Sequence, residues 1–104
     1  MSGSSEAEST KLTIVAQFQA KPGGKDALEA LLLALVDPTR AEKGCEVYDL
    51  HRSVETDGFF HFHEIWTSRA DWDAHMESRH IAEFRASSGD LIETARIFQL
   101  EQIR

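Results

Sequence analysis

Apolar and polar residues alternate in several segments of the chain, and this pattern predicts β-strands. In KLTIVAQFQA, residues 11–20, the bulkier apolar side chains fall on one face. CEVYDLHR, residues 45–52, is rich in residues that favour extended structure, and FFHFHEIWT, residues 59–67, alternates throughout. IFQLEQI, residues 97–103, is also typical of a strand. The pattern therefore predicts four strands.

Two helical regions are predicted between these strands. From Lys25 onward, leucine and valine residues recur at steps of three and four, which is typical of an amphipathic helix. This helix is expected to end near Asp37-Pro38, because proline lacks a backbone N–H and disfavours helical geometry in the preceding residue. Ser68 followed by Asp71 predicts the start of the second region. The residues SSG at 87–89 are expected to bend or break it.

The element order βαββαβ predicts an α+β domain. Right-handed crossovers then give a ferredoxin-like antiparallel sheet with the helices on one face. The opposite face would carry Val15, Val47, Ile65 and either Ile97 or Ile103. Such a face is more apolar than one exposed to water. We therefore expect a second sheet to cover it, as in a homodimer.

Length and composition predict one folded domain. The chain has 104 residues, and its first ten, MSGSSEAEST, are mostly small, polar and acidic. Residues 1–10 are therefore expected to form a disordered tail and residues 11–104 the domain. A chain this short buries only about 60 to 70% of the surface that it exposes when unfolded, so association would add useful burial.

Charge and cysteine content limit the partners and the compartment. The formal net charge of −7 argues against nucleic acid and anionic membrane surfaces as partners. The lone cysteine, Cys45, cannot close an intramolecular disulfide, and no apolar run approaches the roughly 18 residues of a membrane span. The N-terminus also lacks the features of a secretory signal. Together these features predict a cytoplasmic protein.

The strand at residues 59–67 offers a candidate acid. Its alternation places Glu64 on the same face as Phe60, Phe62 and Trp66. If this face points inward, burial raises the pKa of the Glu64 carboxyl, as suits an acid–base or substrate-orienting group. A structural carboxylate bonded to the backbone or to a histidine is the alternative. Trp66 could line a cavity or pack in the core.

Histidines offer candidate bases, since imidazole titrates near neutral pH. His75 lies on the helix face that is expected to contact the sheet, where the spacing fits either a base or a buried structural histidine. His61 and His63 point the same way from one strand, but Glu64 points to the other face and two ligands do not make a catalytic zinc site. We predict no metal site. The chain also lacks a phosphate loop and a dinucleotide fingerprint, so no nucleotide cofactor is implied.

Three segments resemble the antibiotic biosynthesis monooxygenase (ABM) superfamily: VAQFQAKPGGKDALEALL, PTRAEKGCEVYDLHR and FHFHEIWTSRADWDAH. The most specific pieces are Glu42-x-Gly44-Cys45, Tyr48-x-Leu50-His51, Glu64-x-Trp66 and His75, in the family's order. The resemblance covers residues 11–103. It implies a dimeric α+β barrel in which two sheets face each other, with a pocket in each protomer between its sheet and its helices.

The resemblance implies a cofactor-independent monooxygenase. Its substrate would be a quinol, phenolic or polyketide-type aromatic whose anion reduces dioxygen directly, without metal, flavin or haem. On this interpretation His75 or His51 accepts the substrate proton, and Glu64 orients the base or the substrate. The aromatic walls would be Trp66, Phe62, Phe60 and Tyr48. Strand parity places His51 and Tyr48 on opposite faces unless a bulge intervenes.

Two other functions remain open. A cofactor-free isomerase of a small metabolite needs the same acid and base without oxygen, and a non-catalytic ligand-binding barrel needs neither. Haem degradation is less favoured, because Gln17 stands where those members of the superfamily carry an asparagine.

Overall fold

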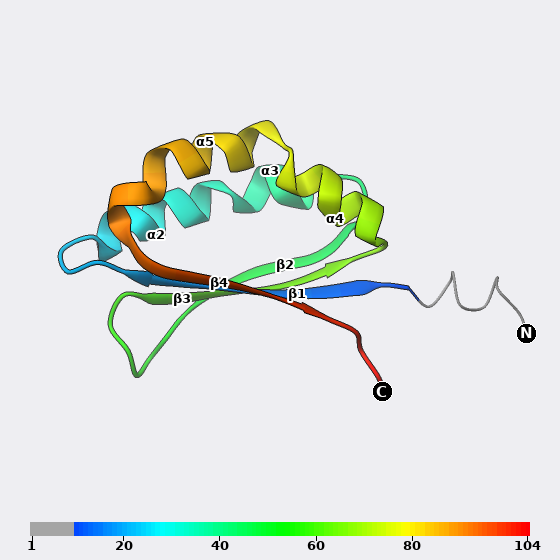
Figure 1. The fold of residues 1–104 in the computed structure, drawn as a ribbon, viewed down its shortest axis with the longest axis horizontal. Coiled ribbons are helices and arrows are strands. Elements are labelled where there is room, and N and C mark those ends of the chain that lie inside the picture. Colours follow the sequence, from blue (N-terminus) through cyan, green and yellow to red (C-terminus); the bar gives the residue numbers. More distant parts are fainter. Residues whose placement is uncertain (1–9) are drawn as a thin grey trace, which may run out of the picture.

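The chain forms a four-stranded antiparallel sheet with its helices on one face (Figure 1). The computed structural model describes residues 10–104, so all of the predicted tail except Thr10 lies outside the described residues. The elements are, in chain order, β1 (Leu12–Ala20), α2 (Lys25–Ala34), α3 (Val36–Arg40), β2 (Cys45–Arg52), β3 (Phe59–Trp66), α4 (Arg69–Met76), α5 (Arg79–Ser88), the 3-10 helix η1 (Gly89–Leu91) and β4 (Ile92–Leu100). The strand order β2-β3-β1-β4 confirms the predicted ferredoxin-like α+β fold.

The first helical region differs from the prediction. Pro38 does not end the first helical region; the break falls at Leu35, between α2 and α3. Pro38 lies in the first turn of α3, where its missing N–H needs no helical acceptor. Ser68 caps α4 as predicted, since its hydroxyl accepts a hydrogen bond from the backbone N–H of Asp71. No helix in residues 10–104 is long and apolar enough to cross a membrane.

The last strand begins earlier than predicted. β4 starts at Ile92 rather than Ile97 and ends at Leu100. It pairs with β1 along nearly its whole length, at the edge of the sheet. Residues 93–96, with the sequence ETAR, are exposed and mostly polar, so the apolar pattern does not mark them as a strand. Pairing with a neighbouring strand, and not side-chain pattern, determines this part of the strand.

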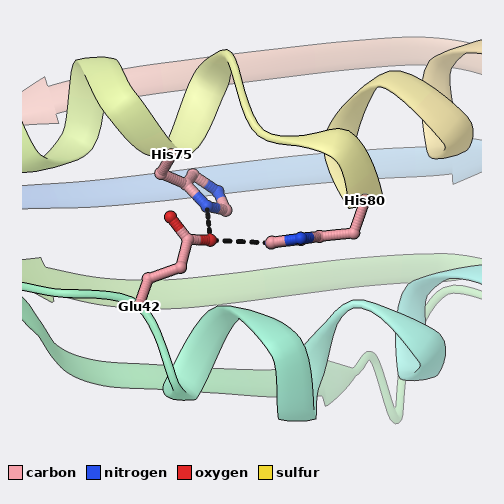
Figure 2. Close-up of side chains that lie close together, drawn as sticks. All are labelled: Glu42, His75 and His80. Atoms are coloured by element: carbon pink, nitrogen blue, oxygen red, sulfur yellow. Dashed lines mark hydrogen bonds and ion pairs between the residues drawn. The ribbon is translucent and has the colours of Figure 1, made fainter.

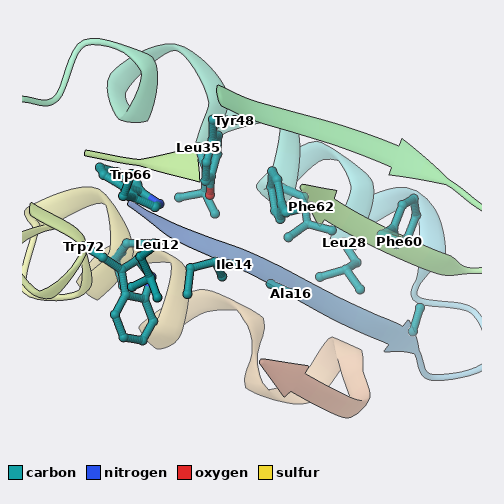
Figure 3. Packing of buried hydrophobic residues seen from close by; sticks show 13 residues of the cluster. Leu12, Ile14, Ala16, Leu28, Leu35, Tyr48, Phe60, Phe62, Trp66 and Trp72 are labelled. Carbon is teal, nitrogen blue, oxygen red and sulfur yellow. The ribbon is translucent and has the colours of Figure 1, made fainter. Parts of the chain in front are cut away.

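Alternation along β3 places one side of the strand in the core. Phe60, Phe62, Glu64 and Trp66 are all buried, as predicted, and the residues between them are partly exposed. Figure 3 shows the three aromatic side chains spaced along this strand. They join a core to which α2 contributes Leu28 and Leu32. The helix-facing side of the sheet therefore carries both the core and Glu64.

The opposite face of the sheet is partly apolar. It carries three residues predicted there: Val15, Val47 and Ile65. The prediction of Ile97 or Ile103 on this face is wrong. Ile97 pairs with Ala16 on the helix side, and Ile103 follows the end of β4. Phe98, which pairs with Val15, occupies the outer face instead.

Candidate functional site

A cavity of about 270 Å³ lies between the sheet and the helices α4 and α5. Its walls are mostly apolar, and the polar residues that line it are Glu64, His75, Arg85 and Ser88. The volume is close to the lower limit of about 300 Å³ for small-molecule sites. An apolar cavity with a few polar groups is typical of a site for a small, mainly apolar ligand.

The structure brings four of the predicted site residues to this cavity: Glu64, His75, Phe62 and Tyr48. Trp66, contrary to the prediction, does not line it; the indole is fully buried behind Glu64. Phe60 does not line it either; it lies near the start of β3, before Phe62. Strand alternation gives the correct face for both residues but does not determine which of them reach the cavity.

Glu64 is a buried carboxyl with one protein partner. The Trp66 indole Nε1–H donates a hydrogen bond to Glu64 Oε1 at 2.9 Å. Burial raises the pKa of Glu64 to about 7, opposed by the bond from Trp66 and supported by the charge of Glu42. Near neutral pH this carboxyl is therefore partly protonated. It can then act as an acid or hydrogen-bond donor toward a molecule in the cavity.

His75 is a buried imidazole held by a carboxylate. Its Nδ1 lies 2.8 Å from Glu42 Oε2 (Figure 2). Because a carboxylate only accepts, Nδ1 carries the hydrogen and Nε2 of the neutral ring is the unprotonated nitrogen. Nε2 has no hydrogen-bond partner within residues 10–104. Burial lowers the pKa of His75 despite the opposing effect of Glu42, so the ring is neutral and can accept a proton.

Sequence reasoning missed the roles of Glu42 and His80. Glu42 belongs to the motif Glu42-x-Gly44-Cys45, but nothing local shows that it meets His75, 33 residues away. His80, at the start of α5, lies 2.7 Å from the same Glu42 oxygen. Gly44 explains part of the approach: it has a positive φ of 83°, and a Cβ there would collide with Asp71 of α4. The loop can therefore pack closely against α4.

Tyr48 and Cys45, on β2, are not nucleophiles in this arrangement. Tyr48 stacks on Phe62 with ring centroids 4.5 Å apart, and burial raises the pKa of its phenol, which stays neutral. Burial, with the charges of Glu64 and Glu42, raises the pKa of Cys45 to about 11. The thiol is therefore protonated near neutral pH, and a protonated thiol is a poor nucleophile.

Three other histidines lie on the outer face of the sheet. His51 pairs with His61 across β2 and β3, with their rings 5.8 Å apart, and His63 lies two residues further along β3. None of the three lines the cavity, as predicted for His61 and His63. The prediction of His51 as a base for this cavity does not fit the structure, since strand parity turns it away from Tyr48 and Glu64.

On the helix side of the sheet, three side chains have the chemistry of metal ligands. Within the described part of the chain, Glu42, His75 and His80 offer ligand atoms that all lie within 4.8 Å of one another. Both imidazoles contact one oxygen at 2.7 and 2.8 Å, which are hydrogen-bond distances. Ligands of a tetrahedral zinc ion with bonds of about 2.0 to 2.1 Å are separated by roughly 3.3 Å. As it stands, the cluster has the geometry of a hydrogen-bonded network.

Comparisons with known proteins agree with this architecture. The family model for antibiotic biosynthesis monooxygenase matches residues 11–87. The chain is 40% identical over 81 residues to "Putative monooxygenase Rv0793" of Mycobacterium tuberculosis, covering 78% of this chain and 79% of that protein. The crystal structure of PA3566 from Pseudomonas aeruginosa has a TM-score of 0.89 at 37% identity and covers 93% of this chain and 98% of that one.

A solved structure described as an antibiotic biosynthesis monooxygenase has a TM-score of 0.83 at 28% identity, covering 89% of this chain and 99% of that one. The family model spans most of the folded domain, and the structural matches extend over nearly all of it. Fold, sequence and motif order therefore agree, and the chain belongs to the antibiotic biosynthesis monooxygenase family.

Proposed function

We propose that the protein is a cofactor-independent monooxygenase of a small phenolic or quinol-type aromatic. The observation that carries the proposal is the pairing of an imidazole base, His75, with a partly protonated carboxyl, Glu64, in one apolar cavity. A quinol supplies the electrons for dioxygen itself. For a naphthoquinol, the quinol and one O2 give a hydroxynaphthoquinone and one water, so no external reductant is needed.

In this mechanism His75 Nε2 takes the proton of a substrate hydroxyl, and the Glu42 carboxylate stabilises the resulting imidazolium. The electron-rich substrate anion then transfers electrons to dioxygen within the cavity. Protonated Glu64 donates a hydrogen bond to a substrate oxygen, while Trp66 holds the other carboxyl oxygen in place. Phe62 and Tyr48 supply the aromatic wall.

The test of this function uses extensively dialysed protein of measured metal content. Incubated in air with 1,4-naphthoquinol, the protein should consume dioxygen faster than the buffer alone and produce a hydroxynaphthoquinone. Activity should persist without added metal, flavin or haem and in the presence of a chelator. If the quinol binds but oxygen uptake stays at the autoxidation rate, the oxygenase proposal fails. Proton exchange on the bound ligand would then favour the isomerase alternative, and its absence the non-catalytic barrel.

The outer face of the sheet supports a homodimer as part of this proposal. We expect sedimentation at micromolar concentration to give the mass of two 11.7 kDa chains. Val15→Lys places a charge on this face in β1, one of the two inner strands, and should yield monomers. Val54→Lys is the matched control, because Val54 is 98% exposed in the β2–β3 loop. A wild-type monomer across this concentration range would contradict the dimer.

A further inference from the structure

We propose that Glu42 and His80 are positioning residues that hold His75 in the tautomer with Nε2 free to act as the base. The expected effect on turnover rests on the proposed function, whereas the expected tautomer of His75 does not. The three side chains come from different places in the chain: the loop after α3, helix α4 and the start of α5 (Figure 2).

One carboxylate oxygen connects the cluster. Glu42 Oε2 accepts from His75 Nδ1 at 2.8 Å and from His80 Nε2 at 2.7 Å. Two charge-assisted bonds to a single oxygen fix the carboxylate more firmly than one bond would. Because the oxygen has no hydrogen to give, the bond to His75 is possible only when Nδ1 carries the proton. The cluster therefore selects the tautomer that leaves Nε2 as the acceptor.

Burial across the cluster increases toward the cavity. The side chains of His80 and Glu42 are 21% and 18% exposed, whereas that of His75 is 3% exposed. Burial alone would weaken the base, because an imidazolium is costly away from water. The hydrogen bond and charge of Glu42 oppose this effect by raising the pKa of His75. The electrostatic effects of His80 and Arg85 are smaller and lower that pKa. Glu42 is thus the group that favours protonation of His75.

His80 acts through Glu42 and not on the substrate, since it does not line the cavity. Its Nε2 also lies 3.3 Å from the hydroxyl of Ser78, the residue that caps α5. The cap therefore ties the His80 ring to the start of its own helix. Loss of His80 would release the Glu42 carboxylate from one of its two partners and let it turn toward solvent.

The first test is ¹⁵N NMR of the His75 ring in the full chain, which needs no turnover. In the wild type Nδ1 should be the protonated nitrogen of the neutral ring, and the pKa of His75 should be lower in Glu42→Gln, because the carboxylate that raises it is gone. An amide can also donate to Nδ1 and reverse the tautomer. A wild-type ring with Nε2 protonated, or an unchanged tautomer and pKa in Glu42→Gln, would overturn the proposal whatever the activity.

The second test is kinetic and uses 1,4-naphthoquinol. Glu42→Gln should lower kcat about 10²- to 10⁴-fold with little change in KM, as expected when a carboxylate that orients a base is replaced by an amide. His80→Ala should lower kcat about tenfold, and His80→Gln, which retains an N–H donor for Glu42, should restore most of the loss. Glu46→Gln, a surface carboxylate bonded to Lys11, is the control with wild-type kcat.

The outcomes of the two tests are separable. If the wild type oxidises the quinol and neither Glu42→Gln nor His80→Ala changes kcat, the positioning role is wrong and the oxygenase proposal stands. If the wild type is inactive but Glu42 determines the tautomer of His75, the positioning role stands and the oxygenase proposal falls. Zinc bound stoichiometrically to the wild type and lost in His80→Ala would show a metal site in place of the hydrogen-bonded network.

Discussion

Replacing His75 with alanine is expected to lower kcat for naphthoquinol oxidation by about 10²- to 10⁴-fold, the usual contribution of a general base. The imidazole lines the cavity, and Glu42 stabilises its protonated form. No other histidine lines the cavity within residues 10–104, so no neighbouring imidazole can replace it. Oxygen uptake under substrate saturation measures the change.

Loss of kcat must be separated from loss of fold. Glu42 keeps His80 as a partner in His75→Ala, so the carboxylate is not left without a hydrogen bond. The far-UV circular dichroism spectrum of this variant should therefore match that of the wild type. His63→Ala is the matched control, because His63 faces away from the cavity. This variant should keep its kcat and weaken the dimer. Wild-type turnover in His75→Ala would remove His75 as the base.

The sequence predicts the positions of Glu64 and His75 because each depends on a local period. Alternation along β3 turns Glu64 toward the helices, and the spacing in α4 turns His75 toward the sheet. The same parity correctly separates Tyr48 from His51. A local period therefore determines which side of an element a residue faces, and this is the part of the site that the sequence predicts.

The repeat of a strand or a helix does not show which distant segments of the chain come into contact. Glu42 meets His75 and His80 only because the loop before β2 packs against α4, where Gly44 leaves room for Asp71. The set of residues that line the cavity is likewise not given by a local repeat. Trp66 and Phe62 share a face, yet only Phe62 reaches the space beneath α4 and α5. Such features follow from how the layers pack, which neither alternation nor helical spacing specifies.

Replacing Glu64 with glutamine is expected to change how stability depends on pH. Burial raises the pKa of Glu64 from 4.5 to about 7 in the folded protein. Between these values the unfolded chain releases this proton and the folded chain keeps it, so rising pH lowers the free energy of unfolding, and the loss is complete above about pH 7. At about 1.4 kcal/mol for each pKa unit, the total is roughly 3 kcal/mol.

Glutamine removes this titration while its side-chain oxygen can still accept the bond from Trp66. The difference in unfolding free energy between Glu64→Gln and the wild type should therefore shift in favour of the variant by about 3 kcal/mol from pH 4 to pH 8. Urea unfolding at equal chain concentration measures it, since association also affects stability. Other titrating groups, His75 included, are common to both proteins and cancel in the difference.

Glu55→Gln, an exposed change in the β2–β3 loop, is the control and should give a difference that stays flat with pH. A flat difference for Glu64→Gln as well would mean that the carboxyl of Glu64 ionises over the same pH range in the folded protein as in the unfolded chain, near 4.5. Glu64 could then not donate a hydrogen bond to substrate near neutrality, and its part in the proposed mechanism would be electrostatic only. A shift of the expected size would place its proton on the folded protein at the pH where His75 is a neutral base.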